Sequence, residues 1–298
     1  NREVERWGHR TESSLEFIDL RMSNLCNSSC MMCNPDSSSA LIKDFNNWSK
    51  DLDFVGDGRR DYALFQWFND EKIDELMEFK DELKYLYING GEPFMMPAHW
   101  KFLERLIEEG VSQNIKISYN TNCSLYDPEY DNVWKHFDVV TLGLSVDGIN
   151  EKNKWIRSPI NSWESIQSNA ENLLRTPSIS HMNITCTLQW LNLPFMDEFY
   201  DWAIPMTKLK KGTKINQNFL SFPHYLSVNS ASIKWKQRLL SEFKHTKNKQ
   251  HILSQNMVSY LNSNTEDHTL WQQGVKFMDT VSKSRGNWKE VFDYHYFF

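Results

Sequence analysis

The sequence predicts an α/β protein with one barrel-type domain of βα units, followed by a small, mainly helical appendage. Between about residues 15 and 190, short β-rich runs alternate with amphipathic helical stretches, which is typical of βα units around a parallel sheet. After residue 205 this alternation ends. The chain has 298 residues, 40% of them hydrophobic, which is enough for one such domain and a module of about 90 residues.

Five strands are expected in the alternating part, and each is a short run rich in β-branched or aromatic residues. They lie at residues 16–22, 85–89, 114–120, 139–146 and 182–188. Helices are expected between them, because apolar residues recur there at spacings of three and four. The clearest stretches are residues 72–83, 100–109 and 163–174.

The segment 34–68 is longer than an ordinary βα connection and carries many serine and aromatic residues. Long loops after barrel strands often form lids or substrate walls, so we expect that role here. Beyond residue 205 we expect a short strand at 214–220 and helices near 232–244, 251–261 and 269–281. These patterns divide the chain into an N-terminal segment (1–14), a barrel domain (15–204) and a C-terminal module (205–298).

Composition favours a cytoplasmic protein that neither enters a membrane nor binds nucleic acid broadly. No apolar run approaches the roughly 20 residues that span a bilayer, and residues 1–14 are polar. The net charge of -6 provides no overall attraction for nucleic acid. Three of the five cysteines lie close together, which suits a metal site in a reducing compartment better than a set of disulfides.

Those three cysteines, Cys26, Cys30 and Cys33, directly follow the first predicted strand. The C-x3-C-x2-C spacing lets one loop wrap three thiolates around a cube of iron and sulfide, which leaves the fourth iron without a protein ligand. Soft thiolates select iron-sulfur or zinc, but a closed zinc site needs a fourth ligand nearby, and His9 lies far upstream. A zinc knuckle or buried free thiols are the alternatives.

A second motif, Asn89-Gly90-Gly91-Glu92-Pro93, follows the second predicted strand. Together the two motifs resemble the radical S-adenosylmethionine (SAM) superfamily. The resemblance implies a partial (βα)6 TIM-like barrel, an open [4Fe-4S] cluster on the three cysteines, and SAM as the second cofactor. It also implies that this strand end and its acidic residue receive the SAM amino group. The paired glycines make physical sense, because side chains would block the approach of the ligand.

The resemblance extends, with less specific motifs, to other strand ends. It implies that polar side chains at Ser118 and Asn120 meet the SAM ribose, and that the strand ending near Leu188 lies close to the adenine. Met32 stands where most of the superfamily has an aromatic residue before the third cysteine, and its thioether is apolar enough to pack against adenine.

Ser145-Val146-Asp147-Gly148 resembles the S-[IL]-D-G motif of the peptide-modifying branch, so Ser145 and Asp147 are expected near SAM. Arg157 follows, and its guanidinium can meet the SAM carboxylate through paired hydrogen bonds. Ordinary loop polarity and helix capping are the alternative explanation for these strand-end residues.

The C-terminal module resembles the twitch half of the SPASM/twitch subgroup, mainly in residues 277–288. Twitch modules often hold an auxiliary cluster on several cysteines. No cysteine follows Cys186, so we expect no auxiliary cluster. Cys123 and Cys186 are expected to be buried small hydrophobic residues.

The resemblance implies an enzyme in which one electron from the reduced cluster cleaves SAM into methionine and a 5'-deoxyadenosyl radical, which abstracts hydrogen from a substrate. An external donor such as flavodoxin or ferredoxin would supply the electron. A peptide or protein side chain is the leading substrate, and a nucleoside, nucleotide or other small molecule is the alternative. A non-catalytic iron-sulfur protein is the third possibility, although it would not need Glu92 and Arg157. The sequence names no substrate-side acid or base.

Overall fold

The computed structural model describes residues 15–56 and 61–297, so the predicted N-terminal segment 1–14 lies outside the described residues. Its centre is a six-stranded, all-parallel sheet in which the strands follow one another in sequence order. The strands are β1 (Phe17–Arg21), β2 (Tyr85–Asn89), β3 (Lys116–Thr121), β4 (Val139–Ser145), β5 (His181–Leu188) and β6 (Lys214–Phe219). Among the described residues β1 does not pair with β6, so the sheet is an open, partial barrel. The predicted α/β fold is confirmed.

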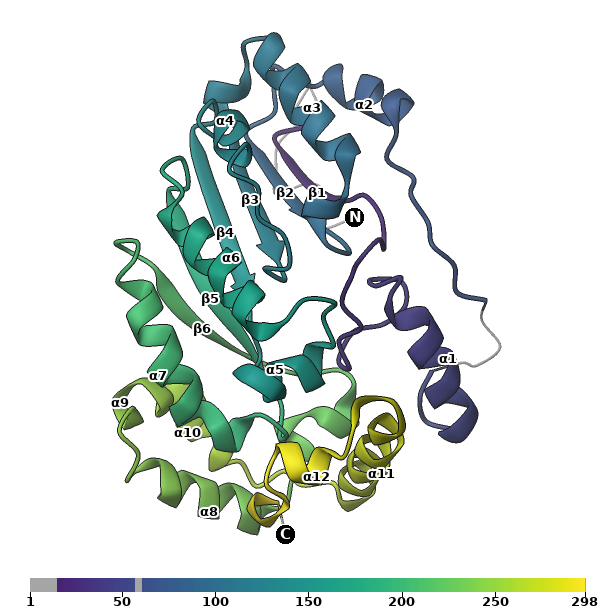
Figure 1. Ribbon diagram of the computed structural model, residues 1–298, viewed down its shortest axis with the longest axis vertical. Coiled ribbons are helices and arrows are strands. Elements are labelled where there is room, and N and C mark those ends of the chain that lie inside the picture. Colours follow the sequence, from purple (N-terminus) through teal and green to yellow (C-terminus); the bar gives the residue numbers. More distant parts are fainter. Residues whose placement is uncertain (1–14, 57–60, 298) are drawn as a thin grey trace, which may run out of the picture.

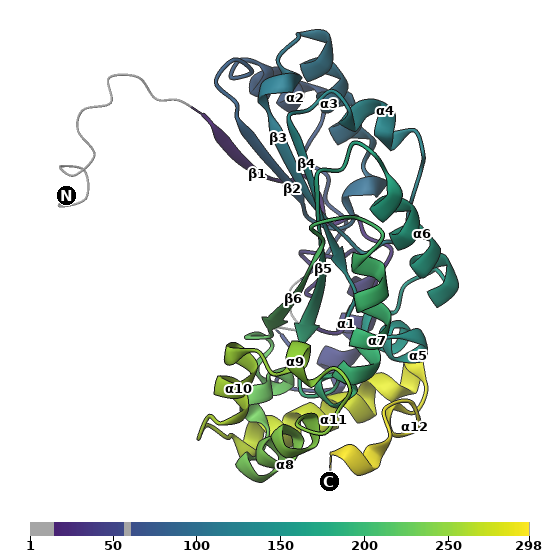
Figure 2. The same cartoon turned by 90° about the vertical axis from the view of Figure 1, so that its left-hand side faces the viewer.

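Side chains alternate between the two faces of this sheet, as the two-residue period of a strand requires. One face is apolar and fully buried, for example at Leu86, Ile117, Leu142 and Ile184. Helices cover this convex face, and the opposite, concave face is free of them (Figure 2). The covering helices are α2 (Asp70–Met77), α3 (Pro97–Glu108), α4 (Tyr130–Trp134), α6 (Trp163–Arg175) and α7 (Met196–Thr207).

The strand expected at 214–220 does not belong to a separate module. It is β6, and it pairs in parallel with β5 from Asn183↔Lys214 to Leu188↔Phe219. The strands that end at Thr121, Ser145 and Leu188 are the third, fourth and fifth of the sheet, and β6 is the sixth. The predicted division between residues 204 and 205 falls inside α7.

The segment 34–68, expected to be a lid-like loop, contains the helix α1 (Leu41–Asp51). Leu41 and Trp48 are buried and Phe45 packs partly buried against the core, so this helix has an apolar stripe at spacings of four and three that was not predicted from the sequence. The helix expected at 251–261 is interrupted. It forms α9 (Lys249–Ile252) and α10 (Gln255–Leu261), because the Ser254 hydroxyl accepts a hydrogen bond from the Met257 amide and begins a new helix.

The C-terminal helices lie at the end of the sheet where the strands finish, beside α1 and α5 (Asn150–Arg157) (Figure 1). They are α8 (Ile233–Phe243), α11 (His268–Arg285) and α12 (Trp288–Val291), together with α9 and α10. Trp48 of α1 packs edge-on against Phe277 of α11, with ring centroids 5.1 Å apart. Within the described residues, no helix is both long and apolar enough to cross a bilayer.

Candidate active site

The cysteine loop follows β1 and is held by its own serines. The Ser38 hydroxyl donates to the Ser28 carbonyl at 2.7 Å, and the Cys33 amide donates to the Cys30 carbonyl at 3.0 Å. Cys30 is buried, Cys26 is half-buried and Cys33 is exposed. The loop therefore brings three thiols of graded exposure to the carboxyl edge of the sheet.

The glycine turn after β2 packs directly on this loop. The Glu92 amide donates to the Leu25 carbonyl at 2.8 Å. Gly90 and Gly91 have φ angles of +87° and +57°, and a Cβ atom on Gly91 would lie 2.7 Å from the Leu25 carbonyl carbon and closer still to its oxygen. Glycine is thus required here for the turn to pack against the cysteine loop. The expected approach of a ligand is a second reason for glycine at these positions.

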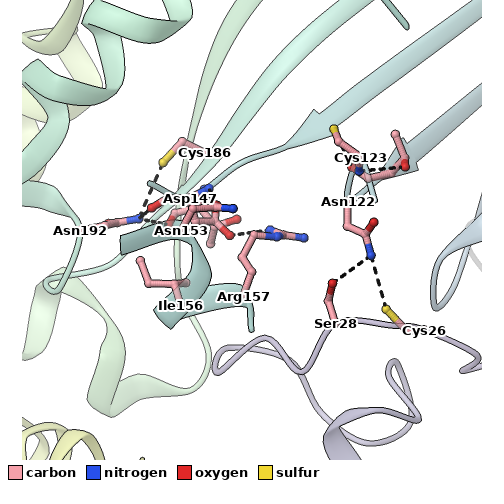
Figure 3. Close-up of polar contacts among 12 residues, drawn as sticks. Cys26, Ser28, Asn122, Cys123, Asp147, Asn153, Ile156, Arg157, Cys186 and Asn192 are labelled. Atoms are coloured by element: carbon pink, nitrogen blue, oxygen red, sulfur yellow. Dashed lines mark hydrogen bonds and ion pairs between the residues drawn. The ribbon is translucent and has the colours of Figure 1, made fainter. Parts of the chain in front are cut away.

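Asn122, at the end of β3, joins the cysteine loop from the other side (Figure 3). Its side-chain amide donates to Asn27 Oδ1 at 2.9 Å and Ser28 Oγ at 3.1 Å, and lies 3.9 Å from Cys26 Sγ. The sequence analysis did not single out this residue, although its place directly after a strand is a signal. Hydrogen bonds to ligand sulfurs are one of the factors that set the potential of an iron-sulfur cluster.

Glu92 lies beneath the glycine turn and is 1% exposed. Its carboxylate accepts hydrogen bonds from Thr121 Oγ1 at 2.8 Å and from the Asn122 amide at 2.7 Å. Burial raises the pKa of Glu92 to about 7, although these hydrogen bonds act in the opposite direction. In this structure Glu92 therefore ties the ends of β2 and β3 together, and its contact with the SAM amino group stays a prediction.

Arg157 and Asp147 form a buried ion pair, with Nη1 and Oδ2 2.5 Å apart (Figure 3). Asp147 is held in turn, because its Oδ1 accepts the Thr187 amide at 2.7 Å. The Arg157 Nε is buried and has no hydrogen-bond partner among the described residues. This donor is available to an anionic ligand, so the predicted contact with the SAM carboxylate fits the geometry and stays a prediction.

The other predicted SAM residues divide by the face of the sheet on which they lie. Ser118 and Asn120 are on the concave face, where they hydrogen-bond to Tyr85 and Tyr87, and Ser145 lines the same concave cavity. Leu188 is fully buried, and by alternation it lies on the convex face. Its side chain therefore cannot meet an adenine in the cavity, and only its main chain can.

Three further predicted residues surround the motifs. Asn89 donates from its side-chain amide to Asp19 at 2.6 Å, and Pro93 is buried at the start of a short 3-10 helix (Pro93–Met95). Met32 is half-buried, which leaves part of its thioether open to a ligand. All three lie at the carboxyl edge of the sheet.

Arg285 is the last residue of α11. No role was predicted for it from the sequence, where it is only one of the residues of the twitch-like segment. Its side chain is 5% exposed, and its guanidinium donates to the Trp155 carbonyl at 2.8 Å and the Ile156 carbonyl at 3.1 Å. It also donates to the Ser29 carbonyl and pairs with Asp44. One side chain of the C-terminal helices thus joins the cysteine loop, α1 and α5.

The three thiols differ in acidity. The hydrogen bond between Cys33 and Cys30 lowers the pKa of Cys30 to about 7 and raises that of Cys33, and burial raises the pKa of Cys26 to about 11. In the part of the chain that the structure describes, no three His, Cys, Asp or Glu side chains converge on one metal ion. A cubane does not require such convergence, because its three cysteines bind three different irons.

Comparison with known proteins identifies the family. The model of the family described as "Radical SAM superfamily" matches residues 20–187, which span β1 to β5 and include both motifs. The chain belongs to the radical SAM superfamily. This membership confirms the predicted class of protein, an enzyme, and its predicted cofactors, a [4Fe-4S] cluster and SAM.

Individual relatives are distant. The chain is 23% identical over 195 residues to "Uncharacterized protein MJ0907" of Methanocaldococcus jannaschii, covering 64% of this chain and 59% of that protein. Native anSMEcpe with bound AdoMet superposes with a TM-score of 0.51 at 18% identity, covering 85% of this chain and 63% of that one. A polyhistidine-tagged form of anSMEcpe with bound AdoMet gives 0.50 at 17% identity, with coverages of 78% and 60%. The chain thus spans about three fifths of the length of these relatives.

The two cysteines outside the motif behave as predicted. Cys123 is fully buried and Cys186 is 1% exposed. Burial raises the pKa of Cys123 to about 12 and also raises that of Cys186. Both are buried neutral thiols, as predicted, although Cys186 Sγ also accepts a hydrogen bond from the Asn192 side-chain amide at 3.7 Å.

Proposed function

We propose that this protein is a radical SAM enzyme in which Cys26, Cys30 and Cys33 hold one [4Fe-4S] cluster. The direct packing of the cysteine loop on the Gly90-Gly91 turn carries this proposal, because it unites the two motifs at one edge of the sheet. When bound, the cluster supplies one electron that cleaves SAM into methionine and a 5'-deoxyadenosyl radical, which abstracts hydrogen from substrate. A donor of the flavodoxin or ferredoxin class delivers the electron.

The protein's own part is to bind and orient SAM. Arg157 donates a hydrogen bond to the SAM carboxylate from its Nε, the donor that does not bind Asp147. The turn from Asn89 to Pro93 binds the SAM amino group. Ser118, Asn120 and Ser145 are placed for the ribose, and Met32 for the adenine. Asn122 donates toward Cys26 Sγ and so stabilises the charge on that ligand.

The substrate we propose is a peptide or protein side chain. Support comes from Ser145-Val146-Asp147-Gly148 at the end of β4, which resembles the motif of the peptide-modifying branch. In this proposal β6 completes the barrel, and the helices that follow it form a twitch-like module. Nucleosides, nucleotides and other small molecules are the competing substrates.

Anaerobic reconstitution, followed by incubation with SAM and dithionite, tests the cofactor chemistry. We expect slow formation of 5'-deoxyadenosine without any substrate, detected by chromatography and mass spectrometry. Cys30→Ala is expected to abolish it, whereas Cys186→Ala, which changes a buried thiol outside the motif, is the matched control. Persistent formation of methylthioadenosine in place of 5'-deoxyadenosine would show that a different sulfur–carbon bond breaks.

A further inference from the structure

The residues on either side of Cys30 are tied to the same point of the structure, at the end of α5. The Met31 amide donates to the Ile156 carbonyl at 3.0 Å, and Arg285 Nη1 donates to the same carbonyl at 3.1 Å. Arg285 Nη2 donates to the Ser29 carbonyl and to Ser29 Oγ, the latter at 3.2 Å. The guanidinium of Arg285 therefore lies against the main chain that carries Cys30, the buried one of the three predicted cluster ligands.

The positive charge of Arg285 is shielded from water and only partly compensated. Its side chain is 5% exposed, and its ion pair among the described residues joins Nη2 to Asp44 Oδ2 at 3.4 Å. Asp44 is itself 24% exposed, and the same oxygen accepts a hydrogen bond from the Ser29 hydroxyl at 3.2 Å. The other described partners of Arg285 are neutral oxygens and the ring of Trp48, whose centroid lies 5.3 Å from the guanidinium carbon. A charge in such surroundings acts more strongly on nearby groups than it would in water.

Arg157, the proposed partner of the SAM carboxylate, differs from Arg285 in this respect. Its Nη1 lies 2.5 Å from Asp147 Oδ2, and the Asp147 side chain is 1% exposed. The opposite charges of such a close pair largely cancel at a third group, because they lie at nearly equal distances from it. A bound SAM carboxylate would compensate Arg157 further. Arg285 is thus the arginine whose charge is left to act on the cysteine loop.

Electron transfer to a cluster on Cys26, Cys30 and Cys33 is sensitive to such a charge. One electron passes from the donor, which is oxidised, to the cluster, which is reduced, and no bond forms or breaks in this step. The cluster and its thiolates become more negative, so a nearby positive charge stabilises the reduced state. Net charge and exposure to solvent are among the factors that set the reduction potential of an iron-sulfur cluster.

We propose that Arg285 is a positioning residue for this electron transfer: it holds a positive charge beside the Cys30 segment and so makes the cluster easier to reduce. This inference rests on the proposed function. It gives the C-terminal helices a part in the reaction, although residues 205–298 contain no cysteine. Arg285 ends α11, which packs against α1 and lies beside α5 at the carboxyl edge of the sheet (Figure 1).

Anaerobic redox titration of the reconstituted protein, followed by the electron paramagnetic resonance signal of the reduced cluster, tests the inference. Arg285→Met removes the charge and keeps a long side chain. We expect the equilibrium constant for reduction to fall about tenfold, which is about 59 mV for a one-electron couple. Lys283→Met, which removes an exposed charge from the same helix, is the matched control and should titrate like the wild type.

Arg285→Lys separates the charge from the hydrogen bonds. Lysine keeps the positive charge but lacks the planar fork that reaches several carbonyl oxygens at once. We expect the equilibrium constant for reduction to stay within about threefold of the wild-type value, even if the loop is less stable. Equal shifts in Arg285→Met and Arg285→Lys would show that loosening of the loop is the cause and would overturn the inference.

Asp44→Asn tests the same charge in the opposite direction. Asparagine keeps an oxygen that can accept from Ser29 and Arg285, but it removes the negative charge that partly compensates the guanidinium. We expect the equilibrium constant for reduction to rise by about threefold or more. Asp51→Asn, on the exposed side of the same helix α1, is the control and should leave the constant unchanged. A loosened loop cannot explain opposite shifts in Asp44→Asn and Arg285→Met, so a fall or no change in Asp44→Asn counts against the inference.

The same titrations separate this inference from the proposed function. If Arg285→Met fails to bind iron, the sign of the shift in Asp44→Asn decides the matter. If the wild-type cluster is reduced by dithionite and both variants titrate like it, the inference falls and the proposed function stands. If the wild type binds no cluster, the proposed function fails and the inference fails with it.

Discussion

Gly91 lies against the main chain of Leu25, and this contact joins the glycine turn to the cysteine loop. The Leu25 carbonyl accepts the amide of the next residue, Glu92, at 2.8 Å, and the space that a Gly91 side chain would need is filled by the Leu25 backbone. Any side chain at Gly91 must therefore move the loop that carries Cys26. The placement of the predicted cluster ligands thus depends on a glycine that has no reactive side chain.

Gly91→Ala is expected to destabilise the protein by about 2–4 kcal/mol, because alanine is strained at a φ of +57° and also meets Leu25. Iron content after reconstitution should fall as well. Gly110→Ala is the control, since Gly110 has a φ of +70° but no atom near its Cβ position. It should cost about 1 kcal/mol and leave the iron content unchanged. Equal iron content in both variants would show that the Gly91 contact does not matter to the cluster.

The number of irons tests the ligand assignment. One cubane on three thiolates requires about four irons per chain. Alanine at Cys26, Cys30 or Cys33 should remove the cluster, measured by iron assay and absorbance. Cys123→Ala and Cys186→Ala should retain it, although each leaves a small cavity. About eight irons would indicate an auxiliary cluster, and iron loss in either control would overturn the assignment.

Arg157→Lys tests the proposed SAM carboxylate site. Lysine keeps the charge beside Asp147 but lacks the planar fork that binds two carboxylates at once. We expect SAM affinity of the reconstituted protein, measured by calorimetry, to fall about tenfold with the cluster intact. Arg238→Lys, on the exposed side of α8, is the control. Unchanged affinity in Arg157→Lys would mean that this arginine serves only to hold Asp147.

The buried Glu92 predicts a dependence of stability on pH. Its pKa is raised from an ordinary 4.5 to about 7, so the folded protein holds the proton more tightly than the unfolded chain. The resulting stability is fully present below pH 4.5 and is lost as the pH rises through 7. Relative to Glu92→Gln, the wild type should lose up to about 3 kcal/mol between pH 5 and 8. Melting curves of both proteins at several pH values measure this loss. A constant difference in stability between the two across this pH range would contradict the prediction.

Glu92→Gln also tests the predicted contact with the SAM amino group. The neutral amide of glutamine can still reach the SAM amino group. The hydrogen bond loses its charge-assisted part, which is about 1–3 kcal/mol in a site shielded from water. SAM affinity measured by calorimetry above pH 7 should fall by about 5-fold to 150-fold. If affinity is unchanged and only stability responds, Glu92 acts through Thr121 and Asn122 alone.

Arg285→Met should loosen the cysteine loop. The substitution removes hydrogen bonds to the Ser29, Trp155 and Ile156 carbonyls, and we expect a loss of about 2–4 kcal/mol and faster loss of iron in air. Lys283→Met lies two residues earlier on α11, and its ion pair with Asp51 is exposed. This control should change stability by less than about 1 kcal/mol. Equal rates of iron loss in the two variants would contradict a role for Arg285.

Much of the fold is readable from the sequence because the strands are short, apolar and separated by helical periodicity. The predicted strand at 85–89 matches β2, and the others agree within about two residues. β6 was placed outside the barrel because four of the six residues in Lys214–Phe219 are polar, and its pairing partner is visible only in space. The helix α1 was not predicted, although Leu41, Phe45 and Trp48 carry helical spacing, because it lies within the segment 34–68 that was interpreted as a loop.

By itself, the sequence determined the family and the glycine turn, and it predicted the three cluster ligands, since these depend on residue types at short spacings along one chain. Only the tertiary structure decided that Asn122 and Arg285 hold the cysteine loop and that Leu188 faces away from the cavity. The physical reason is that these relationships join residues up to 256 positions apart, or depend on which face of a strand a side chain occupies. Local patterns carry no information about such partners until the sheet curves and brings its strand ends together.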